Sequence, residues 1–356
     1  MTQDLIVRRA EANDAERWDD YAAAHRHGLA YHGFAWKQAV EAAYQFICPY
    51  FYAEKGKKIC GVMPLVHLRP PFGRGKLVSL PYCDAGGILA DSVEIQTALF
   101  DRACQYAREH KIGTIEMRFA RQGNVPEADP ARFPKVRMVL SLPGSVEKLL
   151  ASFKSKLRSQ VKKPARDGLY VRLGGAELLA DFYPVFAANM TDLGSPVHSE
   201  NWLRSILIAY GQKAKCGIVY MPDHTPAAGG IVLCHSRVVS IPWASSLKQF
   251  NRFNPNMFLY WSFLEYAAGN GYAFFDFGRS TPGEGTYHFK SQWGAKPQPL
   301  VWKQWKIDKE VVRENRHSTT AGSFSRTRTL AEKTIRQMPL KTSVFFGSRI
   351  RKYISL

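Results

Sequence analysis

The stretch from Asp276 to Gly294 holds the densest group of chemically active side chains in the sequence. It reads as a strand that runs into a loop holding four glycines and then into an aromatic and basic segment containing Phe289-Lys290. Glycines let the backbone come close to a ligand, and polar side chains on a loop at a strand end are common in binding sites. We therefore predict a functional site here. The alternative is a polar hairpin loop in which Asp276 and Arg279 only pair with each other.

A second candidate site lies at the start of a predicted helix. Asn254 can cap this helix, and Pro255 suits its first position. The preceding loop carries Lys248 and Arg252. Because a helix start presents N–H groups and the positive end of the helix dipole, phosphate binds there readily. With Asn256, these side chains form a candidate phosphate-binding set, and the alternative is an ordinary capped helix beside a solvated loop.

Two basic segments accompany these sites. In residues 154–166, Leu157 and Val161 recur at four-residue spacing among cations, which predicts an amphipathic helix. It is either a solvated connector or a contact for phosphate or tRNA. From residue 311 the chain holds ten Lys or Arg against two Glu, interleaved near its end with aromatic and aliphatic residues. This basic amphipathic tail suits a bilayer surface or docking on the protein's own body.

Composition limits the classes of function. The net charge of +19 in 356 residues favours anionic partners such as phosphate-bearing substrates, RNA or a lipid leaflet. The first nine residues lack an apolar segment behind their charges, and no apolar run approaches the roughly 20 residues of a membrane-spanning helix. The six cysteines form no Cys-x-x-Cys pair, so we expect no metal site and buried thiols in a cytoplasmic protein.

The chain carries an internal duplication. Ser79-Leu80-Pro81-Tyr82 and Ser240-Ile241-Pro242-Trp243 share the form Ser, aliphatic, Pro, aromatic, and begin 161 residues apart. Each tetrad follows an apolar strand and precedes a helix, a glycine and another strand. The predicted strands span residues 58–66, 114–119, 227–233 and 272–277. The predicted helices span residues 92–109 and 255–268 and end near Gly113 and Gly271.

Several segments together resemble the FemAB (FemABX) family, and most closely its subgroup associated with the exosortase (PEP-CTERM) system. The resemblance covers roughly residues 5–310. It rests on the segments His32-Gly33-Phe34-Ala35-Trp36, Val62-Met63-Pro64-Leu65, residues 79–87, Leu157-Arg158-Ser159-Gln160, residues 189–199, residues 242–246 and residues 276–290. The family's fold implies an α/β protein with mixed sheets and two tandem GNAT-like domains. We place them at residues 1–145 and 146–310, followed by the tail at residues 311–356.

The resemblance also implies roles for single residues. Lys290 would stabilise the negative charge on a carbonyl oxygen attacked by an amine, and Arg279 would bind a phosphate or carboxylate. Asp276, Asp84, Glu284 or His198 would accept the proton of the amine, although His198 also suits a packed core position. The further candidates for substrate binding are Tyr82, Trp243, Ser245, Ser246, Tyr287 and Phe289.

The implied activity is transfer of an acyl or aminoacyl group from aminoacyl-tRNA or an acyl thioester to an amine. The acceptor would be related to the cell envelope or an exopolysaccharide and linked to lipid or nucleotide, and no tightly bound cofactor is expected. The chain lacks the family's Arg near residues 192–194, so binding of a UDP-linked muropeptide is not expected. The alternatives are an acyl-CoA N-acetyltransferase and a non-catalytic binder of glycan, RNA or membrane. We expect a cytoplasmic location, with the tail at the inner membrane surface.

Overall fold

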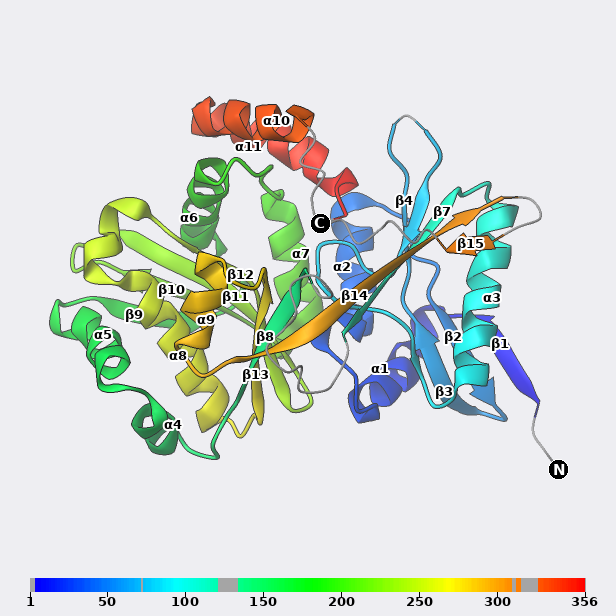
Figure 1. Cartoon of the computed structure of the whole chain (residues 1–356), viewed down its shortest axis with the longest axis horizontal. Coiled ribbons are helices and arrows are strands. Elements are labelled where there is room, and N and C mark those ends of the chain that lie inside the picture. The colour runs from blue at the N-terminus through cyan, green and yellow to red at the C-terminus, as the bar shows by residue number, and fades with distance from the viewer. Residues whose placement is uncertain (1–3, 72, 121–133, 309–311, 315–325, 356) are drawn as a thin grey trace. The chain divides into compact units, whose positions relative to one another are not determined.

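A computed structural model describes residues 4–71, 73–120, 134–308, 312–314 and 326–355. The chain divides into two compact units (Figure 1). The first comprises residues 1–137, 298–321 and 353–356, and the second comprises residues 138–297 and 322–352. We placed residues 298–310 in the second domain and the whole tail apart from both. The structure assigns residues 298–308 to the first unit because Leu300 to Lys306 pair there with an earlier strand, and it divides the tail between the units.

The first unit contains two sheets. One has the order β1 (Leu5–Arg9), β2 (Phe51–Lys55), β3 (Lys58–Met63) and β6 (Leu89–Ala90). The other joins β4 (Val66–Leu68), β5 (Lys76–Val78), β7 (Thr114–Ala120) and β14 (Lys296–Ile307), with β15 (Val312–Glu314) beside β14. Its helices are α1 (Ala15–Ala24), α2 (Phe34–Tyr44) and α3 (Val93–Glu109). The apolar face of α3, with Ile95 and Leu99, packs on the sheets to form the core.

The second unit has one sheet with the order β13 (Phe274–Ser280), β12 (Val238–Ser246), β11 (Pro226–His235), β10 (Ala214–Tyr220) and β9 (Tyr170–Gly174). All neighbours are antiparallel except β12 and β13. Strand β8 (Val136–Ser141) spans the boundary between the units. The helices are α4 (Val146–Ser152), α5 (Ser155–Arg166), α6 (Leu179–Asp192), α7 (Glu200–Tyr210), α8 (Pro255–Gly269), α9 (Gly285–Ser291), α10 (Arg326–Gln337) and α11 (Leu340–Ile350).

Two neighbouring glycines on β11 let helices approach both faces of this sheet. A Cβ on Gly229 would lie 2.7 Å from the Phe182 ring of α6, and a Cβ on Gly230 would lie 3.2 Å from the Phe263 ring of α8. Successive side chains on a strand point to opposite faces, so α6 and α8 cover opposite sides. Gly217 on β10 is paired with Gly230 and meets the same Phe263 ring.

Most predicted elements are confirmed, with shifted ends. Ser92 caps α3, since its hydroxyl accepts a hydrogen bond from the Ile95 amide. The predicted strand at residues 58–66 is instead two strands, because Pro64 lies where the first must end. Gly271 takes the left-handed conformation after α8, as predicted, whereas Lys111 takes it after α3 in place of Gly113. All six cysteines are free and buried.

The duplicated tetrads begin alike and then differ. Both units contain a parallel strand–helix–strand crossover, from β5 through α3 to β7 and from β12 through α8 to β13. The Ser79 amide donates to the Glu116 carbonyl, and Ser240 is paired with Asp276. After Ser79 the chain turns, with Leu80 and Tyr82 both at a φ of 67°, whereas after Ser240 strand β12 continues. The duplication therefore holds for the crossover and not for the conformation of the whole tetrad.

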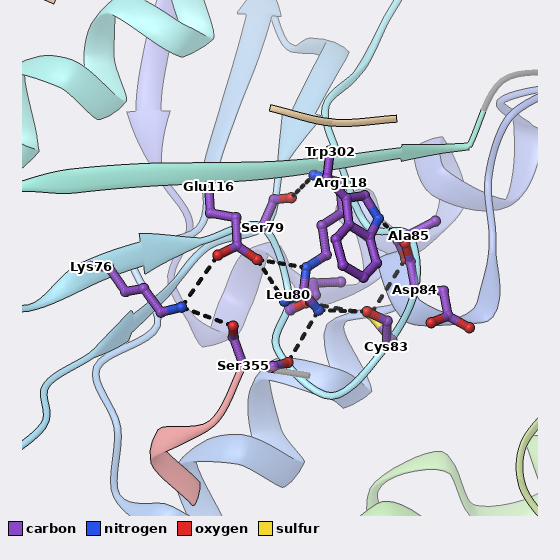
Figure 2. A network of polar contacts seen from close by, with 10 residues as sticks. All are labelled: Lys76, Ser79, Leu80, Cys83, Asp84, Ala85, Glu116, Arg118, Trp302 and Ser355. Atoms are coloured by element: carbon purple, nitrogen blue, oxygen red, sulfur yellow. Dashed lines mark hydrogen bonds and ion pairs between the residues drawn. The ribbon is translucent and has the colours of Figure 1, made fainter. Parts of the chain in front are cut away.

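The turn after Ser79 is held by a buried guanidinium (Figure 2). Arg118, 1% exposed, donates from Nη1 to the main-chain oxygens of Leu80, Cys83 and Ser355 at 3.3, 2.7 and 3.1 Å. Its Nη2 lies 2.6 Å from a carboxylate oxygen of Glu116, which also bonds Lys76. Burial by itself would raise the pKa of Glu116, but the two cations outweigh it and hold that pKa below its usual range.

We expect Gly230→Val to lower the free energy of unfolding by about 1–3 kcal/mol, because the added side chain has no space beside Phe263 and the Trp243 carbonyl. Urea denaturation measures this change. Gly285→Ala is the matched control, since a Cβ there meets open space. Equal stability of Gly230→Val and wild type would contradict the close approach of α8 to the sheet.

Glu116→Gln should cost about 3–5 kcal/mol at neutral pH, because it leaves the buried Arg118 without its carboxylate. The pKa of Glu116 is depressed in the folded state. The ionised carboxylate therefore stabilises the fold fully at a pH above the ordinary glutamate pKa of about 4.3. This stabilisation is lost as the pH falls through the folded-state pKa. The difference between variant and wild type should therefore shrink on acidification.

Urea denaturation at pH 7 and pH 3.5 measures this dependence on pH. The control is Glu109→Gln, which removes a carboxylate 44% exposed and should cost less than about 1 kcal/mol. A difference for Glu116→Gln that stays constant with pH would contradict the ionised buried pair.

Candidate functional site

The predicted site at residues 276–294 is a strand, a turn and a short helix. Asp276, Gly278 and Arg279 lie on β13, and α9 begins at Gly285. The prediction of a long glycine-bearing loop was thus wrong in its second half, where residues 285–291 are helical. Asp276 is 3% exposed, and its Oδ1 accepts a hydrogen bond from the Gly278 amide at 2.9 Å.

Lys290 lies on α9 and is buried, with 8% of its surface exposed. Its Nζ donates to the main-chain oxygens of Arg279 at 2.7 Å and Gly278 at 3.2 Å. The ammonium therefore lies against the carboxyl end of β13. These bonds tie the helix to the strand and keep a positive charge at the strand end.

Aromatic rings surround this junction. Tyr260 of α8 stacks on Phe277 of β13 at 5.6 Å and meets Phe289 of α9 edge-on at 5.0 Å. Burial raises the pKa of the Tyr260 hydroxyl. Trp293 packs with the same rings. Phe289, a predicted substrate contact, thus packs within this cluster. Glu284 precedes α9 and is exposed, and Tyr287 on α9 is half-buried.

Strand β12 carries three predicted contacts. Trp243 is buried and meets Trp202 of α7 edge-on at 6.1 Å. Ser246 lies at the end of the strand, and its carbonyl accepts a bond from the Asn189 side chain at 3.4 Å. Ser245 is 3% exposed, and its hydroxyl has no hydrogen-bond partner among the described residues. A buried unpaired hydroxyl is costly, so Ser245 is available to a ligand.

The parallel ladder between β12 and β13 is short. It pairs Val238 with Phe274, Val239 with Phe275 and Ser240 with Asp276, and it ends there although both strands continue. The hydroxyls of Ser240 at the last pair and Ser280 at the end of β13 are also buried without a partner in the described part of the chain. Beyond the last pair, the main-chain groups of β12 and β13 are therefore no longer paired with each other.

The predicted phosphate site precedes α8. Pro255 occupies the first turn as expected, but Asn254 takes the left-handed conformation and its side chain makes no capping bond, so the predicted cap was wrong. Lys248 is directed to Asp192, with its Nζ 3.2 Å from the carboxylate. The Arg252 guanidinium lies over the Phe253 ring at 4.6 Å. Asn256, on the first turn of the helix, is half-buried.

The basic segment 154–166 forms helix α5, as predicted, and packs on α8. Leu157 and Val161 are buried, as their spacing indicates. Lys163 reaches the loop before α8, where its Nζ lies 3.5 Å from the Arg252 carbonyl oxygen. Cations of α5 and of this loop are therefore neighbours at the start of α8.

The remaining candidates lie apart from this group. His198 is 2% exposed in the second unit, and burial, followed by the charge of Arg351, holds its pKa well below the usual range. His198 therefore fits the packed core position that was the alternative to its role as a proton acceptor.

Tyr82 and Asp84 belong to the first unit. The Tyr82 amide donates to the Ser355 carbonyl, and the Asp84 carbonyl accepts from the Trp302 indole at 3.0 Å. Figure 2 shows the Asp84 carboxylate apart from the Arg118 contacts.

Sequence reasoning missed a cavity of about 870 Å³ in the first unit. Its walls come from separate segments of the chain, and they include His32, Gly87, Phe119 and Lys303. The only signal in the sequence was that His32 and Gly87 lie in two segments that carry the FemAB resemblance, and neither was assigned a role there.

Comparison with known proteins agrees with this architecture. Residues 151–291 match the acetyltransferase (GNAT) domain family. No curated protein matches the chain by sequence. The fold is similar to that of FemX, with a TM-score of 0.66 and 14% identity over 83% of this chain and 95% of that one.

Two further solved structures are similar in fold. A tandem GNAT protein from the clavulanic acid biosynthesis pathway has a TM-score of 0.54 and 13% identity over 86% of this chain and all of that one. L-PGS from Bacillus licheniformis has a TM-score of 0.51 and 12% identity over 93% and 98% of the two chains. The chain therefore has the α/β fold of tandem GNAT proteins, and its acetyltransferase (GNAT) domain at residues 151–291 supports an acyltransferase.

Proposed function

We propose that this chain is a FemAB-type N-acyltransferase or aminoacyltransferase. It would move the acyl group of an aminoacyl-tRNA or acyl thioester to an amine of an envelope or exopolysaccharide acceptor. The observation that carries the proposal is the separation of β12 and β13 after Ser240 and Asp276, inside the residues that match an acetyltransferase domain. The fold similarity to FemX supports it.

The separation suits an extended acyl donor. Where a ladder ends, main-chain amides and carbonyls can bond a ligand in place of a strand. Attack of an amine on the donor carbonyl forms a carbon–nitrogen bond and places negative charge on the carbonyl oxygen, which hydrogen-bond donors then stabilise. The buried hydroxyls of Ser245 and Ser280 are donors of this kind. Collapse of the intermediate expels the thiolate or the tRNA hydroxyl.

Asp276 is the proposed proton acceptor for the attacking amine. It lies at the last pair of the ladder, and one of its oxygens bonds the Gly278 amide. A carboxylate held at this point can take the proton that the amine loses on attack. Lys290 is assigned a positioning role, because its bonds to the Gly278 and Arg279 oxygens fix the end of β13 and place a positive charge there. Arg279 precedes the turn, where it would bind an anionic group of the substrate.

The donor would place its phosphates at the start of α8. Lys163 and Arg252 lie together there, beside a helix end that favours anions. Both coenzyme A and tRNA carry phosphates, so both donor classes fit. The acetyltransferase match favours coenzyme A, and the basic helix α5 together with the net charge of +19 favours tRNA.

We expect Lys290→Ala to lower kcat by roughly a hundredfold, because the end of β13 loses the two bonds that position it, while KM for the donor changes little. The assay is transfer from labelled acetyl-CoA, and separately from charged tRNA, to hexosamine and peptide amines. Lys296→Ala removes an exposed lysine of the same unit and serves as the matched control.

A normal kcat for Lys290→Ala would remove Lys290 from the mechanism. Heat on titration with coenzyme A selects the thioester donor, and transfer from tRNA without such heat selects the aminoacyl donor. If no donor is turned over and wild type and variant bind glycan, RNA and vesicles equally, the chain is a binding protein and the enzymatic proposal fails.

We further propose that the tail contacts an anionic membrane surface. Among the described residues, no helix combines the length and apolar character needed to cross a membrane. Helix α11 instead packs on α6, with Ser343 bonded to Thr191 and Gly347 against Val197. This leaves three large apolar side chains about half exposed beside cations, namely Phe345, Phe346 and Ile350. Such a surface suits the interface of a bilayer that carries acidic lipid.

Replacing Phe345 and Phe346 together by Ser should reduce flotation with vesicles that contain acidic phospholipid, because it removes apolar area from the proposed contact. The control replaces Val93 and Ile208 by Ser, two exposed apolar residues outside the tail. Equal flotation of both double variants and wild type would contradict a membrane contact through α11.

A further inference from the structure

The last described residues of the chain are bound to the turn that follows Ser79. The main-chain oxygen of Ser355 accepts hydrogen bonds from the Tyr82 amide at 2.7 Å and from Nη1 of Arg118 at 3.1 Å. The Ser355 hydroxyl accepts a third bond, from Nζ of Lys76 at 2.8 Å. Figure 2 shows Ser355 between Lys76 and Arg118. All of these residues belong to the first unit, and two of the three donors are cations.

The turn needs contacts from outside because its backbone is strained. Leu80 and Tyr82 are both in the left-handed conformation, which is unfavourable for residues other than glycine. Arg118 holds the carbonyl oxygens of Leu80 and Cys83, and Ser355 holds the Tyr82 amide. Strain of this kind persists only where the surrounding structure fixes it. Loss of Ser355 would therefore remove one of the contacts that keep the turn in place.

The turn is connected to the glycine segment that follows it. The Gly86 amide donates to the Arg118 carbonyl at 3.0 Å. A Cβ on Gly86 would lie 2.5 Å from the Leu80 side chain, so a change at Leu80 reaches the glycine segment directly. Gly86 and Gly87 line the cavity of the first unit, whereas Ser355 is not among the lining residues. The bonds of Ser355 thus act on a wall of the cavity from outside it.

The same end of the chain has the composition of a membrane-seeking segment. Residues 350–354 read Ile-Arg-Lys-Tyr-Ile, with two cations and no Asp or Glu. Tyrosine and basic side chains beside aliphatic ones favour the interface of an anionic bilayer. Ile350 is 52% exposed, and Tyr353 is partly exposed with its ring 6.0 Å from that of Phe46. Docking on the turn and insertion into lipid would therefore compete for one short segment.

We propose that residues 351–355 form a carboxy-terminal clasp with two states. In the free protein the clasp is docked, and Ser355 holds the turn. When α11 contacts an anionic membrane, the clasp enters the interface with it, Ser355 leaves Tyr82 and Arg118, and the turn and its glycines loosen. Lipid shifts this equilibrium because it contacts these residues only in the released state. The proposal rests on the membrane contact proposed for α11 and adds that the contact is transmitted to the first unit.

Hydrogen exchange of the Tyr82 amide measures whether the clasp holds the turn. Deleting Ser355 and Leu356 should speed this exchange roughly tenfold, or about 1.4 kcal/mol in the opening equilibrium, because the acceptor is gone. The matched control deletes Leu356 alone, which keeps the acceptor, so exchange should stay slow. Unchanged exchange in α3 shows that the first unit is folded in both variants. Equal exchange of the Tyr82 amide in the two variants would overturn the clasp.

Vesicles test its release in the full chain. With vesicles of phosphatidylcholine and phosphatidylglycerol, exchange of the Tyr82 amide should become as fast as in the two-residue deletion. Phosphatidylcholine alone should leave it slow, and replacing Phe345 and Phe346 together by Ser should remove the effect of the acidic lipid.

The clasp and the membrane contact fail in different ways. Flotation of the full chain with acidic vesicles, without faster exchange of the Tyr82 amide, would overturn the clasp and leave the membrane contact standing. Absence of flotation would overturn the membrane contact, and with it the release of the clasp by lipid. Faster exchange in α3 as well as in the turn would show that lipid unfolds the first unit as a whole, which would also overturn the clasp.

Discussion

In each unit, the residues where the parallel strand pair ends determine which polar groups the crossover can offer to a ligand. These strand pairs are β5 with β7 and β12 with β13. In the first unit the last residue pair is Val78 with Glu116, and the amide of the next residue, Ser79, donates to the Glu116 carbonyl. In the second unit the last residue pair is Ser240 with Asp276. The first carboxylate is neutralised by Arg118 and Lys76, and the Ser79 hydroxyl accepts a bond from the Arg118 amide. The second serine hydroxyl is buried without a partner in the described structure. The duplicated position thus holds a packed ion pair in the first unit, and a buried aspartate beside a buried serine hydroxyl in the second.

The same contrast explains why the two units offer different chemistry from one fold. Around Arg118 every guanidinium nitrogen is engaged by protein oxygens, so that region orders the turn that carries Tyr82 and Asp84. In the second unit the ladder ends, and the side chains at its end are an aspartate, unpaired serines and a lysine bound to main-chain oxygens. A site for transfer needs polar groups that the protein itself does not satisfy. Among the described residues, the hydroxyls of Ser240, Ser245 and Ser280 in the second crossover have this property.

The repeated crossover could be predicted from the sequence because each of its helices and strands has its own pattern of apolar residues. Periodic apolar residues indicated α3 and α8, and alternating or continuous apolar runs indicated the strands beside them. What it could not predict depends on distant partners. β14 joins β7 although their paired residues lie 180 to 192 positions apart in the sequence, so our domain boundary failed at residue 298. The cavity was missed for the same reason, since its walls come together only when separate segments fold on one another.

Chain connectivity has a further consequence for how this protein is made. The chain passes between the two units after residues 137, 297, 321 and 352, so the first unit receives strand β14 only after nearly all of the second unit has been translated. Ser355, whose main-chain oxygen accepts a hydrogen bond from Arg118, is translated later still. During synthesis β7 therefore has β5 as its neighbour but lacks β14 until residues 138–297 of the second unit have been made. Long-range pairing of this kind slows folding and exposes strand edges to other chains.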